Sequence, residues 1–446
     1  MTIKSKLLRN FGANAYGQVV TVLIQLVSVP FFLSHWGVAL YGQWLILSAI
    51  PAYLALSDIG FASVAANDMT MKVARKDVRG ALVVYQSVWI LISCITLVVG
   101  GLLALLAVFF PLHDRLSIEH ISSLDTQLIL MLLVAYVLIG LQGNVLNAAF
   151  RSVGRYAYGT ALGNTARLIE WAATMLALWL GSGVMGIALV MLVVKVAGVL
   201  AMWIVLNGEI PWLKLGVQHA SFTEIKRLWR PAVAFMAFPL GLALSLQGMV
   251  LVIGITLGSA AVVMFSVYRT LTRLLVQIIT LLNQSAWPEI SAAYGANKLD
   301  IVTRLHRSFS SLTFWFGLCS VVMLSGTGEW IIKTWTRHAF EQNQVLLVLM
   351  LLTAFLNVLW QTSWVVLMAT NQHQKITAVF LMLAAGGLVL SYLAVPALGI
   401  NGVGMILAAV ELPMLYVAVD RALVVLNDGW YGYAKSVVSI PRFRLV

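Results

Sequence analysis

The sequence predicts an all-α integral membrane protein with about twelve transmembrane helices. Of its 446 residues, 61% are hydrophobic and only 10% are charged, so the chain has too few polar residues to cover a water-soluble core of that size. Apolar runs of about 20 residues recur along the whole chain, which is the length that an α-helix needs to cross a bilayer. Basic residues gather in every second loop between these runs, as expected of a chain that crosses the membrane repeatedly.

The first apolar run follows a basic N-terminus but is too long for a signal peptide and lacks a cleavage site rich in small residues, so we expect an uncleaved first span. Pro30, Pro51 and Pro239 lie inside predicted spans, where proline removes a helical hydrogen bond, and we expect kinks there. The twelve predicted spans are 13–34, 41–66, 82–110, 126–149, 158–180, 184–206, 231–257, 261–285, 307–325, 342–369, 376–396 and 400–426.

The basic residues of the loops predict the orientation. Successive loops between the predicted spans alternate between the two sides of the membrane. The set of loops on one side carries only three basic residues, Arg115, Lys333 and Arg337. By the positive-inside rule the other set is cytoplasmic, which places both termini in the cytoplasm. The cytoplasmic set comprises Lys4, Lys6, Arg9, Lys72, Arg75, Lys76, Arg79, Arg151, Arg155, Lys214, Lys226, Arg227, Arg230, Lys298, Arg304, Arg307, Lys375, Lys435, Arg442 and Arg444.

A faint internal repeat divides the chain. An offset of 221 residues places Gly37 on Gly258 and Leu8-Arg9-Asn10 near Trp229-Arg230-Pro231. The basic loop at about 207–230 then lies where two six-helix halves would join. The sequence therefore predicts an N-terminal bundle at 1–215 and a C-terminal bundle at 216–446, related by an axis along the membrane normal.

Several function classes are excluded by composition and motifs. The formal charge of +12 does not indicate a nucleic-acid partner, because most basic residues stand in the loops described above. The chain has no GxxxxGK[ST] loop, no HExxH and no GxSxG, so an ATPase or hydrolase lacks its usual machinery. Cys94 and Cys319 lie in apolar runs and are expected to be small buried residues, and no cofactor or metal site is predicted.

Two arginines within one span carry the main functional prediction. Arg269 and Arg273 lie about 12 and 18 Å from the outer end of the eighth span, at about 1.5 Å per residue. An arginine at the centre of a span costs roughly 2.5–3.5 kcal/mol on insertion scales. No acidic residue lies within two helical turns, so we expect these side chains to face a wet cavity that binds a diphosphate or a similar anion. Packing between helices is the alternative.

Arg167 and Lys195 also stand deep in spans, and two explanations remain open for each. Arg167 either faces the same anion site or pairs with Glu170, three residues later on the same helix. Lys195 either faces the site, extends toward the interface, or pairs with Glu170 or Glu411.

Acidic and aromatic residues within spans give further candidates. Asp58, Glu170 and Glu411 are candidates for proton coupling or gating, although Asp58 also fits a structural acid near a helix end. A polar and aromatic surface that could contact sugars is formed by Trp360, Trp364, Gln361, Asn357 and Gln277, with packing of the two tryptophans as the alternative.

The first two spans resemble those of a known family. The features that carry the likeness are Asn10 and Asn14 at the entrance of the first span, Pro30 near its end, Gly37 followed by Tyr41-Gly42-Gln43-Trp44, and the Leu56-Ser57-Asp58-Ile59-Gly60 stretch. The second half adds Arg230-Pro231 and Trp287-Pro288-Glu289. In these features the chain is similar to the O-antigen and polysaccharide repeat-unit flippases of the multidrug/oligosaccharidyl-lipid/polysaccharide exporter superfamily, and the likeness extends over essentially the full length.

The resemblance implies two six-helix bundles around a central cavity that opens alternately to either side. It implies a substrate in which undecaprenyl diphosphate carries an oligosaccharide, moved across the bacterial inner membrane for O-antigen, lipopolysaccharide, capsule or exopolysaccharide synthesis. A polymerase and chain-length machinery are implied as partners, together with membrane lipids. We assign the cationic role of the family to Arg167, Lys195, Arg269 and Arg273.

Two rival functions follow from the same sequence. One is a cation-coupled multidrug exporter of the same superfamily, which the excess of cations in the spans disfavours. The other is a polysaccharide polymerase or ligase, which usually carries a large outer loop. The longest predicted outer loops, at 111–125 and 326–341, are too short for that role.

Overall fold

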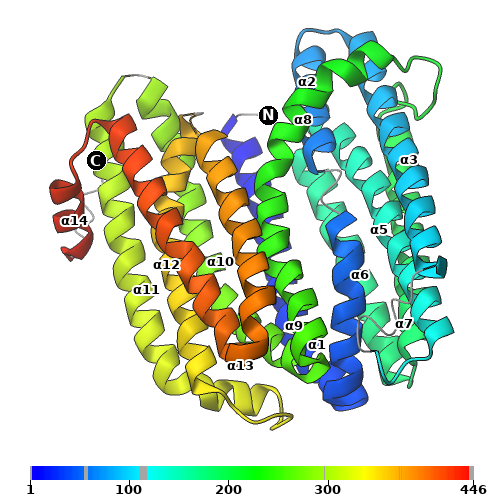
Figure 1. The fold of residues 1–446 in the computed structure, drawn as a ribbon. Helices are drawn as coiled ribbons and strands as arrows, with labels where there is room; N and C mark the ends of the chain where they lie inside the picture. The colour runs from blue at the N-terminus through cyan, green and yellow to red at the C-terminus, as the bar shows by residue number, and fades with distance from the viewer. Residues whose placement is uncertain are drawn as a thin grey trace. The chain divides into compact units, whose positions relative to one another are not determined.

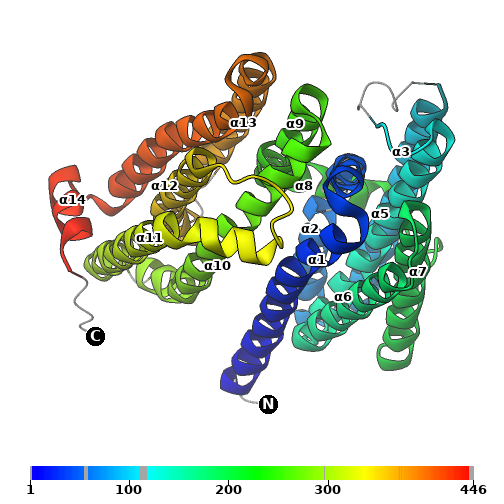
Figure 2. The same ribbon diagram turned by 90° about the horizontal axis from the view of Figure 1, so that it is seen from below.

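The structure is a computed structural model that describes residues 3–54, 59–109, 118–295, 297–370, 372 and 374–440. Within these residues the chain is helical and contains no β-strand. Its internal contacts divide it into two compact units, Met1–Ala243 and Leu244–Val446, which we call the N-terminal and the C-terminal unit. Figures 1 and 2 show the helices from two directions.

The N-terminal unit consists of seven helices among the residues that the structure describes. Its elements are α1 (Ile3–Leu54), α2 (Ile59–Ala74), α3 (Val78–Phe109), α5 (Ser123–Ser152), α6 (Tyr156–Trp179), α7 (Val184–Glu209) and α8 (Phe222–Ala243). The buried core of this unit joins α2, α3, α5 and α7 around Met69, Tyr85, Ile92 and Phe150. This packing fixes α5 and α7, which carry much of the site described below.

The C-terminal unit begins with a π-helical segment and continues in long helices. Its elements are η1 (Leu244–Gly248), α9 (Met249–Leu257), α10 (Ser259–Gly295), α11 (Leu299–Trp335), α12 (Gln344–Ala369), α13 (Gln374–Leu426) and the short α14 (Trp430–Val438). Helix α12 lies at the centre of this unit, where it packs against α10, α11 and α13.

The described helices confirm the predicted fold class. Nine of them, in the part of the chain that the structure describes, are long and apolar enough to cross a membrane. The number is smaller than twelve partly because α1 and α13 each contain two consecutive spans. Their backbones leave the helical region at Gly37 (φ 67°, ψ −175°) and Gly399 (φ 63°, ψ −161°), conformations that glycine adopts without a steric penalty. The remaining difference includes α6, which matches the predicted span 158–180 but carries Arg167 and Glu170.

The 221-residue repeat is present in the backbone. Gly37 and Gly258 share a left-handed conformation, with φ of 67° and 84°, and so do Lys76 and Asn297, with φ of 62° and 56°. The helix boundaries obey the same offset. Helices α2 and α10 end at Ala74 and Gly295, α3 and α11 begin at Val78 and Leu299, and α5 and α12 begin at Ser123 and Gln344. The two halves therefore follow one pattern of helices and turns.

The repeat and the compact units divide the chain at different places. The second copy of the repeat begins with α8 at Phe222, which corresponds to the start of α1 at Ile3 in the first copy. Contacts nevertheless assign α8 to the N-terminal unit, because it packs against α2 and α3. The predicted junction of two six-helix bundles at 215/216 refers to the two copies of the repeat and not to the two compact units, and it remains a prediction.

Two details of the sequence prediction are wrong. Helix α11 continues to Trp335, so the loop predicted from residue 326 is helical over its first ten residues. Cys94 and Cys319 are exposed free thiols rather than buried residues. Both lie on helices whose apolar outer faces would meet lipid, so in such a protein an apolar run does not imply burial within the protein.

Candidate functional site

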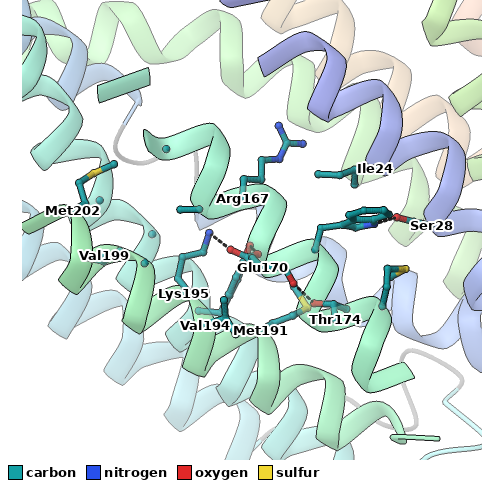
Figure 3. Close-up of a pocket in the computed structure, with 18 of the residues that line it drawn as sticks. Ile24, Ser28, Arg167, Glu170, Thr174, Met191, Val194, Lys195, Val199 and Met202 are labelled. Atoms are coloured by element: carbon teal, nitrogen blue, oxygen red, sulfur yellow. Dashed lines mark hydrogen bonds and ion pairs between the residues drawn. The ribbon is translucent and has the colours of Figure 1, made fainter. Parts of the chain in front are cut away.

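A cavity of about 450 Å³ lies within the N-terminal unit, between α1, α5, α6 and α7 (Figure 3). Small residues, among them Gly140, Gly143, Gly163 and Gly198, line part of its wall. At Gly143 an added Cβ would lie 3.3 Å from a methyl group of Val199 on α7. Glycines thus let α5, α6 and α7 approach closely around the cavity.

A buried carboxylate lies in the wall of this cavity. Glu170 of α6 is 8% exposed, and its Oε2 lies 2.6 Å from the Nζ of Lys195 on α7. The hydroxyl of Tyr136 on α5 donates to the other oxygen, Oε1, at 2.5 Å. The ammonium of Lys195 also lies 4.6 Å from the centre of the Tyr136 ring. Three helices are thereby joined by charge-assisted hydrogen bonds and a cation–π contact, each of which is stronger away from water.

Arg167 does not take part in this pair. Its Nη1 donates to the hydroxyl of Thr21 on α1 at 3.0 Å, and Figure 3 shows its guanidinium pointing away from Glu170. Of the explanations left open by the sequence, the pairing of Lys195 with Glu170 is therefore the one found, and the pairing of Arg167 with Glu170 is not. Since Glu170 balances Lys195, Arg167 leaves the cavity with a formal excess of one positive charge.

A second cavity of about 430 Å³ adjoins the first. Helices α2, α5 and α6 line it, and it shares Asn144, Asn147 and Gly163 with the first cavity. Its wall carries further polar groups from Arg151, Tyr156, Thr160 and Asn164. The two cavities together therefore form one polar path along α5 and α6.

The other two predicted cations, Arg269 and Arg273, lie on α10 in the C-terminal unit. Arg269 donates from Nη1 to the carbonyl oxygen of Leu246 in the π-helical segment at 2.9 Å, and its guanidinium lies 5.3 Å from the centre of the Phe265 ring. The side chain of Arg273 is exposed. Among the residues that the structure describes, it forms no hydrogen bond or ion pair. The four predicted cations are thus divided between the two units.

Glu411 belongs to a separate polar network of the C-terminal unit. Its carboxylate on α13 accepts hydrogen bonds from the indole of Trp360 at 2.6 Å and from the amide of Asn357 at 3.2 Å, both on α12. Gln361 extends the network, since it donates to Asn357 at 2.8 Å and accepts from Thr280 of α10 at 2.9 Å.

The residues predicted to contact sugars mostly serve this network. Trp360 is 1% exposed and packs edge to face against Trp364, with 6.2 Å between ring centres. Asn357 and Gln361 are engaged as described, and Gln277 lies on α10, four residues after Arg273. Asp58 lies outside the described residues.

Tyr136, Thr21 and the two asparagines Asn144 and Asn147 also contribute to the site but were not predicted from the sequence. On α5 the signal was present, because Tyr136, Gly140, Asn144, Asn147 and Arg151 recur every three or four residues and so occupy one helix face. No group of three or more His, Cys, Asp or Glu in the described ranges is arranged to hold a metal ion.

No protein-family model and no curated protein sequence matches the chain. Its fold is similar to that of solved transporters. An inward-facing multidrug resistance MATE family transporter of the MOP superfamily matches 91% of this chain and 96% of its own, with 15% identity and a TM-score of 0.74. The lipid II flippase MurJ in an inward closed conformation matches 96% of this chain and 90% of its own, with 12% identity and a TM-score of 0.71.

A third similar structure is a MOP superfamily transporter from Pyrococcus furiosus. It matches 95% of this chain and 96% of its own, with 15% identity and a TM-score of 0.64. These likenesses establish that the chain has the fold found in MOP superfamily transporters. The prediction of an all-α membrane-protein fold is therefore confirmed.

Proposed function

We propose that the protein is a flippase of the bacterial inner membrane. It moves an undecaprenyl-diphosphate-linked oligosaccharide from the cytoplasmic to the periplasmic leaflet by alternating access, in the service of O-antigen, capsule or exopolysaccharide synthesis. Both termini face the cytoplasm in this proposal, and a polymerase with its chain-length machinery takes up the product. The likeness to a lipid II flippase supports a lipid-linked passenger.

One observation carries the proposal. Arg167 of α6 and Arg273 of α10 are exposed residues within two of the predicted spans, and neither forms an ion pair with a described residue. Each such arginine costs roughly 2.5–3.5 kcal/mol to insert at the centre of a span. A diphosphate offsets that cost, because its oxygens accept paired hydrogen bonds from the planar guanidinium fork. Arg269, one helical turn before Arg273, adds a second donor on the same helix.

Transport in reconstituted vesicles tests this proposal. We expect Arg167→Ala and Arg273→Ala each to reduce the movement of a fluorescent undecaprenyl-diphosphate-linked oligosaccharide at least tenfold, since each removes a charged donor worth about 1.5–3 kcal/mol. Arg421→Ala is the matched control, because Arg421 is an exposed arginine near the end of α13. Full activity of both the Arg167 and the Arg273 variant, or an equal loss in the control, would contradict the proposal.

A multidrug exporter is the second candidate. It is favoured by the half-buried Glu411, whose carboxylate lies beside the aromatic pair Trp360 and Trp364, a setting that suits an organic cation. The likeness to a multidrug resistance transporter also supports it. Drug-susceptibility measurements on cells that express the chain distinguish the two candidates. Increased drug tolerance that depends on Glu411, without movement of the lipid-linked oligosaccharide, would favour the exporter.

A further inference from the structure

The polar path of the N-terminal unit follows one face of α5. Tyr136, Asn144, Asn147 and Arg151 line the two adjoining cavities at spacings of eight, three and four residues, which keeps them on the same side of the helix. At about 1.5 Å per residue the path extends roughly 22 Å from Tyr136 to Arg151. It runs from the pair of Glu170 and Lys195 to the turn between α5 and α6.

Two side-chain amides at the middle of this path have no hydrogen-bond partner among the described residues. They belong to Asn144, which is exposed, and Asn147, which is half-buried, and both line both cavities. Each amide offers two N–H donors and a carbonyl acceptor. In the apolar part of a membrane, amides without partners are costly, so these positions indicate groups that meet water or a ligand.

The facing wall on α6 supplies further groups that remain able to bind. Asn164 donates one weak hydrogen bond, at 3.4 Å, to the carbonyl of Ala13, which leaves its own carbonyl oxygen available. Thr160 lines the same cavity with a hydroxyl. Arg151 and Tyr156 close the path at its end, where they bond Asn67 at 3.0 Å and Asn14 at 2.9 Å. Between Arg167 and Arg151 the polar groups are therefore mainly neutral donors and acceptors.

Neutral amides and hydroxyls on opposite walls suit a ligand that bears many hydroxyl or acetamido groups. The second cavity does not suit a flat aromatic drug, because the rest of its wall consists of small residues such as Ala62, Ala66 and Ala148. We propose that Asn144 and Asn147 form a sugar-binding subsite, in which they hydrogen-bond the glycan of a lipid-linked oligosaccharide while Arg167 contacts its diphosphate. This inference rests on the proposed function and places the glycan in the N-terminal unit rather than at Trp360.

Equilibrium binding to the full-length protein in nanodiscs tests the subsite without transport. The two probes are undecaprenyl diphosphate and the same lipid carrying a disaccharide that contains N-acetylglucosamine. We expect the wild-type protein to bind the glycosylated lipid about tenfold more tightly, the effect of one or two added hydrogen bonds. In Asn144→Leu and Asn147→Leu this preference should fall to about one, while the affinity for the bare lipid stays unchanged.

Gln142→Leu is the matched control, because Gln142 is a neighbouring amide on α5 that bonds Ser93 of α3 and lines neither cavity. The subsite is refuted if the wild-type protein shows no preference for the glycosylated lipid, if the asparagine variants retain it, or if the control loses it too. Failure of the transport proposal would give a different experimental result. A wild-type protein that binds the glycan through these asparagines but does not move the lipid in vesicles retains the subsite and loses the flippase function.

Discussion

The ion pair between Glu170 and Lys195 allows a quantitative test of the N-terminal cavity. Removal of one partner from a fully buried ion pair costs about 3–5 kcal/mol, because a charge is left without compensation. The side chains here are 10% and 23% exposed, and the cavity of about 450 Å³ lets water reach the ammonium. We therefore expect Glu170→Gln and Lys195→Met each to lower the free energy of unfolding by about 2 kcal/mol.

The double variant distinguishes a specific pair from two independent residues. With both charges removed and similar volumes kept, neither charge is left unpaired, so the double variant should lose no more than about 2 kcal/mol rather than twice that amount. The coupling energy is then at least about 2 kcal/mol, which is expected only for residues in direct contact. The exposed pair of Arg304 and Asp300, with side chains 61% and 72% exposed, is the control and should couple by about 0.3–0.5 kcal/mol.

Reversible unfolding of the purified protein in detergent, followed by tryptophan fluorescence, is the appropriate measurement. Thiol-reactive dyes are unsuitable, because Cys94 and Cys319 are already exposed in the folded state. If the effects of the two single variants simply add in the double variant, the ion pair does not hold α6 to α7, and our account of the cavity is wrong.

Three further predictions follow. Glu411→Gln should weaken the pH-gradient dependence of transport in vesicles, because it removes the ionisable group from the network on α12 and α13; unchanged dependence would exclude Glu411 as a proton carrier. Gly258→Ala should lower the free energy of unfolding by about 1–2 kcal/mol, since φ of 84° is unfavourable for alanine, whereas Gly254→Ala inside α9 should not show this backbone penalty. Burial alone raises the pKa of Asp428, but hydrogen bonds from Arg307 and the Gly429 amide outweigh it and hold the pKa below its usual range. The unfolded chain therefore binds the proton more readily, so Asp428→Asn should cost about 1–2 kcal/mol near neutral pH, and this difference should disappear as the pH falls below the ordinary aspartate pKa of about 4.

The spans and the repeat could be predicted because they depend on local sequence. An apolar run of about 20 residues is sufficient to indicate a helix in lipid, and a left-handed turn requires a residue such as Gly37 or Gly258 at a defined place. The partners of charged residues could not be predicted in the same way. Arg167 and Glu170 are neighbours on one helix, yet each finds its partner on another helix, at Thr21 and Lys195.

The exposure of aromatic side chains could not be predicted from the sequence either. Trp360 and Trp364 are one helical turn apart, a spacing that fits a sugar-binding surface as well as a packed interior. For Trp360 the contact with Glu411, about fifty residues later in the chain, determines that the ring belongs to the packed interior. The carboxylate of Glu411 accepts a hydrogen bond from the indole N–H, and the ring is 1% exposed. Contacts of this kind depend on how α12 and α13 cross, which the pattern of a single helix does not contain.

The repeat relates only part of the polar chemistry of the two units. Tyr136 stands thirteen residues after the start of α5 at Ser123, and Asn357 stands thirteen residues after the start of α12 at Gln344. Lys195 and Glu411 are not related in this way, because the residue 221 positions after Lys195 is Tyr416.

The charged groups of the two units therefore differ. In the N-terminal unit Lys195 neutralises Glu170, which α6 supplies, and Tyr136 donates to the same carboxylate. In the C-terminal unit Glu411 accepts from Trp360 and from Asn357, which corresponds to Tyr136 in the repeat, without an ion pair to any described residue. A carboxylate stabilised by neutral donors alone can take up a proton without leaving a cation unpaired, whereas protonation of Glu170 would leave Lys195 uncompensated. The repeated backbone thus places a hydrogen-bond donor, Tyr136 or Asn357, beside a carboxylate in each half. The different partners of the two carboxylates favour Glu411 over Glu170 as the residue that would exchange protons in the proposed transport.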